Sequence, residues 1–596
     1  MGKKSNLPIN YTSRDFETIK QDLVDHAKRY YPDTFQDFNE AGFGSLMLDT
    51  VAYIGDILSF YVDYQANESF VDTATEFQNL VNLGNQTGFK LQSNPSSHGT
   101  VTFFVMIPAN AAATAPDPRY IPILKKSSSL TSTSGARFTL DEDVNFAEGD
   151  TVVARVDPTS GAPTQFAIKN YGAVSSGELR TSVITIGAYE KFRTESIADS
   201  AITNIVSVHD NDGNEYYEVD YLTQNIVMRS TANRDTSTQS TVREILKPLV
   251  VPRRFTTKRT SQGMTLQFGS GKEESSNENV LDPSSVAVKM HGKEYISDVE
   301  LDPSKLLSSD SLGVSPSNTA LTIVYRRNTK DDTNISTNSL TAVDTPLLDF
   351  TDIANLDQTV VQTIQSSVES TNEEPIVGYI EDNNVEVLRQ RVQNSFANQR
   401  RAVTLKDYET MAYSMPYKFG ALKRVKAISN PNPRRGNLNI ATIAIDSDEN
   451  LIPANSILKD NLKTWLDKGR MINDAIEIVD AKIINLGIDF TVVGDLNKDS
   501  SVILQNCISK LEEHFNVKAD IGEDFYITDV YKALKDVEGV IDVVDVKINI
   551  KNGAGYSSTT FNVTDNLSTD GRAINIPRNA IYEIKFPDAD IKGAVR

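Results

Sequence analysis

The chain has 596 residues, of which 39% are hydrophobic and one is cysteine. This composition supports several buried cores and excludes wholesale disorder, while the single cysteine excludes a disulfide framework and a cysteine-rich zinc site. The formal net charge of −21 argues against general nucleic-acid binding, because neutralising phosphates requires clustered Lys and Arg.

Residues 1–95 predict a helical assembly segment. Apolar residues recur at helical spacing from Phe16 to Ala27, and either Thr12 or Ser13 is the expected N-cap. Two further helices are predicted, at about 45–66 and 75–86. No run of 18 uninterrupted apolar residues occurs, so no membrane-spanning segment is expected.

The predicted helix at 45–66 is apolar on nearly its whole circumference. Such a helix is usually buried on several sides, so either the rest of the chain or partner chains must cover it. We predict that it lies in a helix bundle. The predicted interface residues are Leu46, Val51, Ile54, Leu58 and Tyr61.

Residues 96–383 predict a β-rich middle region, because short β-rich runs alternate with clusters of Ser, Thr, Gly, Pro and Asn. Asp212 and Gly213 favour a tight hairpin turn. The polar stretch 329–345 is expected to be a long loop.

Helical spacing returns in a connector at 384–420, where Thr404 and Asp407 have the spacing of a capping box. Residues 421–596 follow the order β-β-α-β-α-α-β, which indicates an antiparallel or mixed sheet with helices on one face. One long strand region is expected at 475–493. The predicted fold class is therefore α+β multidomain, with a helical N-terminal segment, a β-rich middle and an α/β-layered C-terminal domain.

No catalytic constellation stands out in the sequence. The five histidines are widely spaced, and Gly269 to Lys272 lacks the further glycine and the Ser or Thr of a phosphate-binding loop. We therefore predict that the chain is not an enzyme and that it holds no cofactor and no metal.

The charge is uneven along the chain. Residues 388–435 hold 11 basic and 2 acidic side chains, whereas residues 1–95 hold 7 basic and 13 acidic ones. This basic island could be a solvated helix face, a nucleic-acid patch, or a seam that docks against acidic groups of this chain or another. The residues assigned to the basic seam are Arg389, Arg391, Arg400 and Arg401.

Several runs of residues together resemble one family. The run DFNEAGFGSLMLDTVAYIGDILSFYVDYQANESFVDTA at 37–74 resembles the opening of the baseplate J-like proteins of contractile-tailed phages. The run RQRVQNSFANQRRAVTLKDYETMA at 389–412 resembles a later element of that family, and YYEVDYLTQ at 216–224 and LQFGSG at 266–271 fit between them. Within the family, the length and the opening are most similar to the T-even type wedge subunits that form the inner ring of the baseplate.

The resemblance implies a structural virion protein of the tail baseplate, made in the host cytoplasm. Such a subunit builds the inner ring around the tail hub and takes part in the rearrangement that triggers sheath contraction. The implied partners are the tail hub, a larger baseplate wedge protein that shares the N-terminal bundle, a sheath-initiating wedge protein, and a second copy of the chain. The second copy would pair within a wedge, with a dimer contact in the C-terminal domain, and wedges would join into a ring. Neither nucleic acid nor membrane is an implied partner.

Two other functions stay open on the sequence alone. A tail-associated carboxylate hydrolase would need two carboxylates at catalytic separation in a cleft. A nucleic-acid-binding module would be centred on the basic island.

Overall fold

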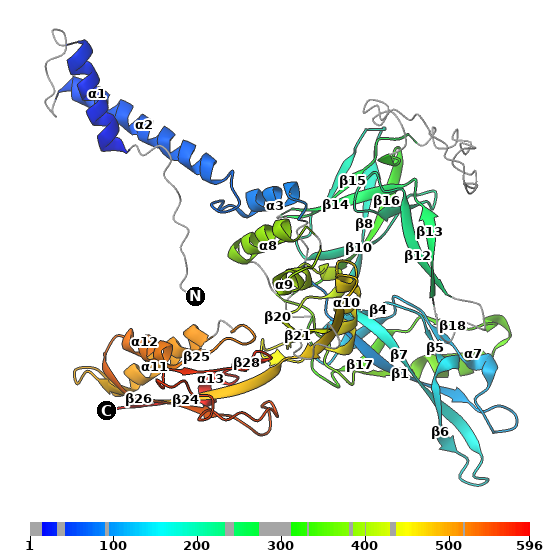
Figure 1. Ribbon diagram of the computed structural model, residues 1–596. Coiled ribbons are helices and arrows are strands. Elements are labelled where there is room, and N and C mark those ends of the chain that lie inside the picture. Colours follow the sequence, from blue (N-terminus) through cyan, green and yellow to red (C-terminus); the bar gives the residue numbers. More distant parts are fainter. Residues whose placement is uncertain are drawn as a thin grey trace. The chain divides into compact units, whose positions relative to one another are not determined.

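The computed structural model describes residues 15–31, 42–89, 94–232, 244–260, 262–272, 312–329, 333–380, 385–399, 401–429, 437–515 and 519–596. The chain divides into two compact units (Figure 1). Residues 1–91 with 382–400 form one, called the helical unit, and residues 92–381 with 401–596 form the other, called the β unit.

The described part of the helical unit consists of helices. They are α1 (Phe16–Tyr30), α2 (Phe43–Asn67), α3 (Phe77–Gln86) and α8 (Val385–Asn398). Helix α1 begins at a capping box in which Asp15 and Thr18 bind each other's backbone N–H groups. The expected caps Thr12 and Ser13 lie outside the described residues. Helices α3 and α8 share a small core, formed by Leu80, Val81, Leu388 and Val392.

The β unit begins with a seven-stranded sheet. Its strand order is β17 (Leu340–Thr345), β3 (Ser129–Ser132), β4 (Arg137–Leu140), β7 (Pro163–Ser176), β1 (His98–Pro108) and β19 (Glu369–Thr371), with β6 (Asp150–Val156) paired to β7. A small sheet orders β18 (Leu348–Asp349), β2 (Ile123–Leu124) and β5 (Val144–Asn145). Helix α7 (Gln358–Ser366) places Val361 and Ile364 in the core of this region. Alternate β1 residues, among them Val101, Phe103 and Val105, are fully buried there, as strand periodicity requires.

A second seven-stranded sheet follows. Its order is β8 (Glu178–Ile186), β16 (Thr319–Arg327), β10 (Ile202–His209), β11 (Glu215–Glu218), β14 (Arg254–Thr260), β15 (Gly263–Phe268) and β9 (Thr194–Ile197). Strands β12 (Ile226–Ala232) and β13 (Glu244–Val250) form a separate two-stranded ribbon (Figure 1). The turn between β10 and β11 confirms the predicted hairpin, with Gly213 at φ +80°.

The C-terminal part of the β unit contains two four-stranded sheets. The first orders β20 (Arg424–Ser429), β21 (Asn437–Ile445) and β22 (Leu451–Ile452), with β23 (Ala475–Asp480) parallel to β21. Helices α9 (Leu405–Tyr413) and α10 (Ser456–Asp467) contribute to its core. The second sheet orders β26 (Val540–Ile550), β24 (Lys482–Gly494) and β28 (Ala580–Glu583), with β29 (Ile591–Val595) also paired to β24.

Helices and short elements complete this region. Helices α11 (Ser500–Phe515) and α12 (Ile527–Lys535) bury Ile503, Leu511 and Leu534 in the core of the second sheet. Short elements of this region are α13 (Pro587–Asp590), β25 (Phe525–Tyr526) and β27 (Ala573–Ile574). Elsewhere in the described part of the β unit are the 3-10 turns η1 (Pro118–Tyr120), η2 (Phe146–Glu148), η5 (Ile353–Asn355) and η6 (Tyr417–Phe419).

The structure confirms the α+β multidomain class and the capping box of Thr404 and Asp407. The prediction of a loop over 329–345 is wrong for the last six residues, because residues 340–345 form edge strand β17, which pairs with β3. The strand region at 475–493 is two strands in different sheets, interrupted at Ala481. The four domain boundaries predicted from sequence stay a prediction.

Candidate functional site

One side of α2 is a stripe of small buried residues. Ser45, Ala52 and Ser59 recur at seven-residue spacing, with exposed fractions of 4%, 0% and 9%. A Cβ atom on Gly55 would lie 3.2 Å from Ile19 Cγ2 of α1, so the two helices approach closely. Small side chains permit this approach, and α1 therefore covers only a narrow part of α2.

The rest of α2 is exposed and apolar. The five residues predicted as the bundle interface are all exposed, at 61% for Leu46, 48% for Val51, 51% for Ile54, 58% for Leu58 and 62% for Tyr61. They share this exposed apolar face with Phe43, Met47, Tyr53, Ile57, Phe60, Val62 and Tyr64. Whether partner chains cover the exposed apolar face stays a prediction.

Three aspartates run along α2 at the same seven-residue spacing. Asp49, Asp56 and Asp63 are half-buried, and Asp49 forms an ion pair of 2.8 Å with Lys20 of α1. The helix is also long and apolar enough to cross a membrane, on length and composition alone. The prediction of no membrane-spanning segment required an uninterrupted run of apolar residues, which the aspartates of α2 break. The mean hydropathy of the helix stays high despite these isolated aspartates.

The turn after α2 is held by a buried carboxylate. Glu68 is 6% exposed, and its side chain accepts hydrogen bonds from Thr75 N at 2.8 Å, Thr75 Oγ1 at 2.6 Å and Asn79 Nδ2 at 2.9 Å. Burial raises the pKa of Glu68, but the hydrogen bonds from Thr75 and Asn79 outweigh it, so the pKa lies below its usual value. Glu68 thus ties the end of α2 to Thr75, just before α3, and to Asn79 in the first turn of α3, a function that its sequence position does not indicate.

Arg389 of α8 forms its hydrogen bonds and its ion pair within the helical unit. It is 5% exposed, and its guanidinium donates to the carbonyls of Val71 (2.9 Å) and Ala74 and pairs with Glu386. From the sequence, the basic seam could bind groups of this chain or of another chain. For Arg389 the structure places the hydrogen-bond acceptors in this chain. Two of them are backbone carbonyls, which no charge pattern reveals.

The other three seam residues are placed differently. Arg391 is half-buried on α8, and Arg401 is exposed in the β unit. Arg400 lies outside the described residues. The basic seam as a surface for partners stays a prediction for these three.

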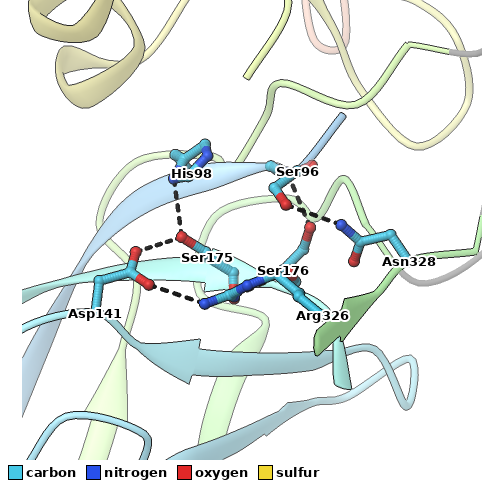
Figure 2. A network of polar contacts seen from close by, with 8 residues as sticks. Ser96, His98, Asp141, Ser175, Ser176, Arg326 and Asn328 are labelled. Atoms are coloured by element: carbon cyan, nitrogen blue, oxygen red, sulfur yellow. Dashed lines mark hydrogen bonds and ion pairs between the residues drawn. The ribbon is translucent and has the colours of Figure 1, made fainter. Parts of the chain in front are cut away.

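A buried polar network, which we call the polar junction, lies where the two seven-stranded sheets meet (Figure 2). Ser175 Oγ lies 3.0 Å from His98 Nδ1 and donates to Asp141, while Arg326 Nη2 lies 3.1 Å from Asp141 Oδ1. Asn328 Nδ2 donates to Ser96 Oγ at 2.9 Å. The network therefore links polar groups contributed by both sheets.

The polar junction contains serine, histidine and aspartate, but its order is not that of a catalytic triad. In a triad the histidine lies between serine and aspartate, whereas here Ser175 lies between His98 and Asp141. Burial lowers the pKa of His98 to about 4, which keeps the ring neutral at physiological pH. Among the described residues, no group of three His, Cys, Asp or Glu side chains is arranged as metal ligands.

The region that matches a known family lies within the helical unit. Residues 15–86 match the family model described as "Bacteriophage baseplate protein, N-terminal domain". The match spans α1, α2 and α3, and so contains the exposed apolar face and Glu68. No curated protein matches the chain.

Two solved structures are distantly similar to the chain. One is the anti-feeding prophage (AFP) baseplate, with a TM-score of 0.28 and 8% identity over 94% of this chain and 90% of that chain. The other is the type VI secretion system TssK-TssF-TssG baseplate subcomplex, with a TM-score of 0.23 and 9% identity over 73% of this chain and 96% of that chain. TM-scores this low do not establish a common fold. The family match shows a region similar to the N-terminal domain of bacteriophage baseplate proteins at residues 15–86, and it supports a structural role in a baseplate.

Proposed function

We propose that the chain is a wedge subunit of the T-even type, which builds the inner ring around the tail hub of a contractile-tailed phage. In this function α2 joins a helix bundle with a larger wedge protein, and a sheath-initiating wedge protein binds that bundle. The family match at residues 15–86 supports the baseplate assignment, and the wedge and ring assignments rest on the sequence resemblance.

The observation that carries the proposal is the exposed apolar face of α2. Monomeric soluble proteins rarely expose contiguous apolar patches larger than a few hundred Å². Twelve large apolar side chains of α2 are exposed over a 25-residue helix. A bundle with helices of other chains would bury this face, and the seven-residue spacing of the small stripe and of the aspartates is the spacing used in helix bundles.

Helices of protein partners fit this face better than lipid. An aspartate at the centre of a membrane-spanning helix costs roughly 2.5–3.5 kcal/mol. Asp49, Asp56 and Asp63 each follow a residue of the small stripe by four positions, and Asp49 already has a cationic partner in α1. A protein bundle leaves this polar line in place and still covers the apolar side.

Ring formation and contraction need contacts that persist while subunits move. We propose that the helical unit holds the bundle while the C-terminal domain of the β unit holds a dimer contact with a second copy. Ile541 and Val544 of edge strand β26 are 61% and 52% exposed and are suited to such a contact. The three remaining seam arginines are candidates for contacts between wedges.

The test is native mass spectrometry of the full chain co-expressed with its neighbouring wedge proteins. We expect a complex with the wild-type chain and at least a tenfold loss of complex with Ile54→Asp combined with Leu58→Asp, because each carboxylate would be buried unpaired. The matched control is Ile472→Asp, which changes an apolar residue that is 97% exposed in the β unit. This control variant should form as much complex as the wild-type chain does.

Circular dichroism of the isolated variants separates assembly from folding. Both substituted residues are about half exposed, so helix content should be unchanged. A wild-type chain that stays alone with all neighbours present, or an unaffected double variant, contradicts the proposal.

A further inference from the structure

Hydrogen bonds hold the base of the ribbon formed by β12 and β13. Arg254 is 2% exposed, and its guanidinium donates to the carbonyl of Leu222, before β12, at 2.7 Å and to the carbonyl of Val251, after β13, at 2.8 Å. Val251 N also donates to Asn225 O at 2.8 Å. One buried side chain therefore holds both the chain entering β12 and the chain leaving β13, although a two-stranded ribbon alone is marginally stable.

The register shows which backbone groups face outward. Pro248 of β13 lies opposite Met228, and because proline has no N–H, this pair is a non-hydrogen-bonded one. Hydrogen-bonded and non-hydrogen-bonded pairs alternate, so the N–H and C=O groups of Ile226, Met228 and Ser230 point away from β13. A hydrogen bond from Gln224 Nε2 to Ile226 O, at 3.1 Å, is consistent with an Ile226 carbonyl that points away from β13.

The two edges of the ribbon therefore differ. Pro248 removes an outward donor from the edge of β13, which is a known way of blocking strand addition. Strand β12 contains no proline, and among the described residues no third strand pairs with it. The edge of β12 thus keeps a row of outward N–H and C=O groups beginning at Met228.

The two faces of the ribbon also differ. One face is apolar and exposed, with exposed fractions of 44% for Ile226, 62% for Met228, 66% for Leu246 and 66% for Val250. On the other face Arg229 lies directly opposite Lys247. Two like charges directly opposite each other destabilise a strand pair, and a carboxylate between them would reverse that effect.

We propose that the edge of β12 binds an extended segment of a partner protein as a third strand. The segment alternates apolar side chains, which cover Met228 and its apolar neighbours, with acidic side chains, which lie against Arg229 and Lys247. Main-chain hydrogen bonds supply affinity and the alternating side chains supply specificity, as in other cases of strand addition.

Other occupants fit the ribbon less well. Inserting it into lipid would leave the outward groups of β12 without hydrogen-bond partners, at a cost of several kcal/mol each. Pairing with the same edge of a second copy would bring two Arg229–Lys247 pairs together. The inference goes beyond the proposed function and does not depend on it, because the ribbon lies outside residues 15–86.

The test uses the full chain and a fluorescent seven-residue peptide that alternates valine and glutamate. We expect saturable binding by fluorescence anisotropy and slower amide exchange in β12. A peptide alternating valine and lysine should not bind. Met228→Pro removes the first outward donor without touching the β12–β13 ladder, and it should weaken binding about tenfold or more. Its matched control, Met228→Ala, keeps the donor and should bind within about threefold of the wild type.

A second pair of variants tests the charge. Arg229→Glu combined with Lys247→Glu should weaken binding of the glutamate peptide about tenfold or more, whereas Arg155→Glu on the exposed strand β6 should leave it unchanged. The proposal is wrong if the glutamate peptide does not bind at millimolar concentration, or if the variant with both charges reversed binds it as well as the wild type does. It is also wrong if the chain binds anionic phospholipid vesicles instead of the peptide.

Discussion

Arg326 Nη2 lies 3.1 Å from Asp141 Oδ1, and this ion pair joins β16 of the second sheet to the residue that follows β4 of the first. Arg326 also donates from Nη1 to the carbonyls of Ser175 at 3.0 Å and Ser176 at 3.2 Å. One guanidinium therefore binds acceptors at the end of β7 and beside β4. These contacts fix the two seven-stranded sheets to each other within the β unit.

The first prediction concerns this ion pair. Arg326→Ala should lower the free energy of unfolding of the β unit by about 3 kcal/mol, because removing one partner of a buried pair leaves its acceptors unsatisfied. The lower end of the usual range is expected because Asp141 is one-third exposed. Urea unfolding followed by fluorescence measures the change.

An exposed pair provides its control. Arg137 and Glu178 lie 2.9 Å apart with side chains 61% and 37% exposed. Arg137→Ala should change the free energy of unfolding by less than about 1 kcal/mol. Equal effects of the two substitutions would show that the polar junction does not hold the sheets together.

The second prediction concerns the pH dependence of stability. His98 has a folded pKa of about 4, against an ordinary value of 6.5, so the unfolded chain binds a proton more readily. Its contribution is fully present above pH 6.5 and is lost as the pH falls from 6.5 to about 4, by roughly 3 kcal/mol in total.

Replacing the histidine isolates this effect. His98→Gln should remove it, so the stability difference between wild type and variant should shrink as the pH falls from 7.5 to 4.5. Urea midpoints measured at intervals over that range test the sign. A difference that is constant with pH contradicts a buried, neutral His98.

The third prediction concerns the contact between α1 and α2. Ala52 is fully buried in the small stripe, so Ala52→Leu should overpack the contact at a cost of roughly 1–3 kcal/mol. Amide exchange in α1 should accelerate while exchange in the β unit stays unchanged. Tyr53→Leu is the control, because Tyr53 is 59% exposed on the neighbouring position. Unchanged exchange in α1 of Ala52→Leu would show that the stripe is not tightly packed.

The fourth prediction concerns Glu68. Glu68→Gln keeps the shape but loses the charge that accepts hydrogen bonds at the start of α3, so α3 should lose about 1–2 kcal/mol of local stability. Since the pKa of Glu68 is lowered in the folded chain, this stability is present above the ordinary value of 4.5 and is lost as the pH falls below it. Amide exchange at Thr75 and Glu76 measures the loss at pH 7.

Glu17→Gln is the matched control, because Glu17 is exposed in the first turn of α1. Its exchange pattern in α3 should equal that of the wild type. If both variants behave alike at Thr75, Glu68 does not stabilise the start of α3.

Local sequence patterns correctly predicted the elements whose structure depends on residues close together in the sequence. The helical spacing of 45–66, the Asp212–Gly213 turn and the Thr404–Asp407 capping box are all present in the structure. Strand β17 was missed because the stretch 329–345 as a whole is rich in Ser, Thr and Asn, and only pairing with β3 makes its last six residues a strand. The break at Ala481 was missed because both flanking segments favour strands, and only the sheets they enter separate them.

The sequence by itself determined the α+β class and the excess apolar surface of α2, because composition and periodicity are properties of the chain alone. The resemblance to baseplate proteins came from particular runs of residues, chiefly those at 37–74 and 389–412. Only the tertiary structure decided which side of α2 is covered, that Arg389 binds carbonyls of its own unit, and that Ser175 lies between His98 and Asp141. These contacts join residues far apart in the chain, and their partners are often backbone atoms, which no side-chain pattern identifies.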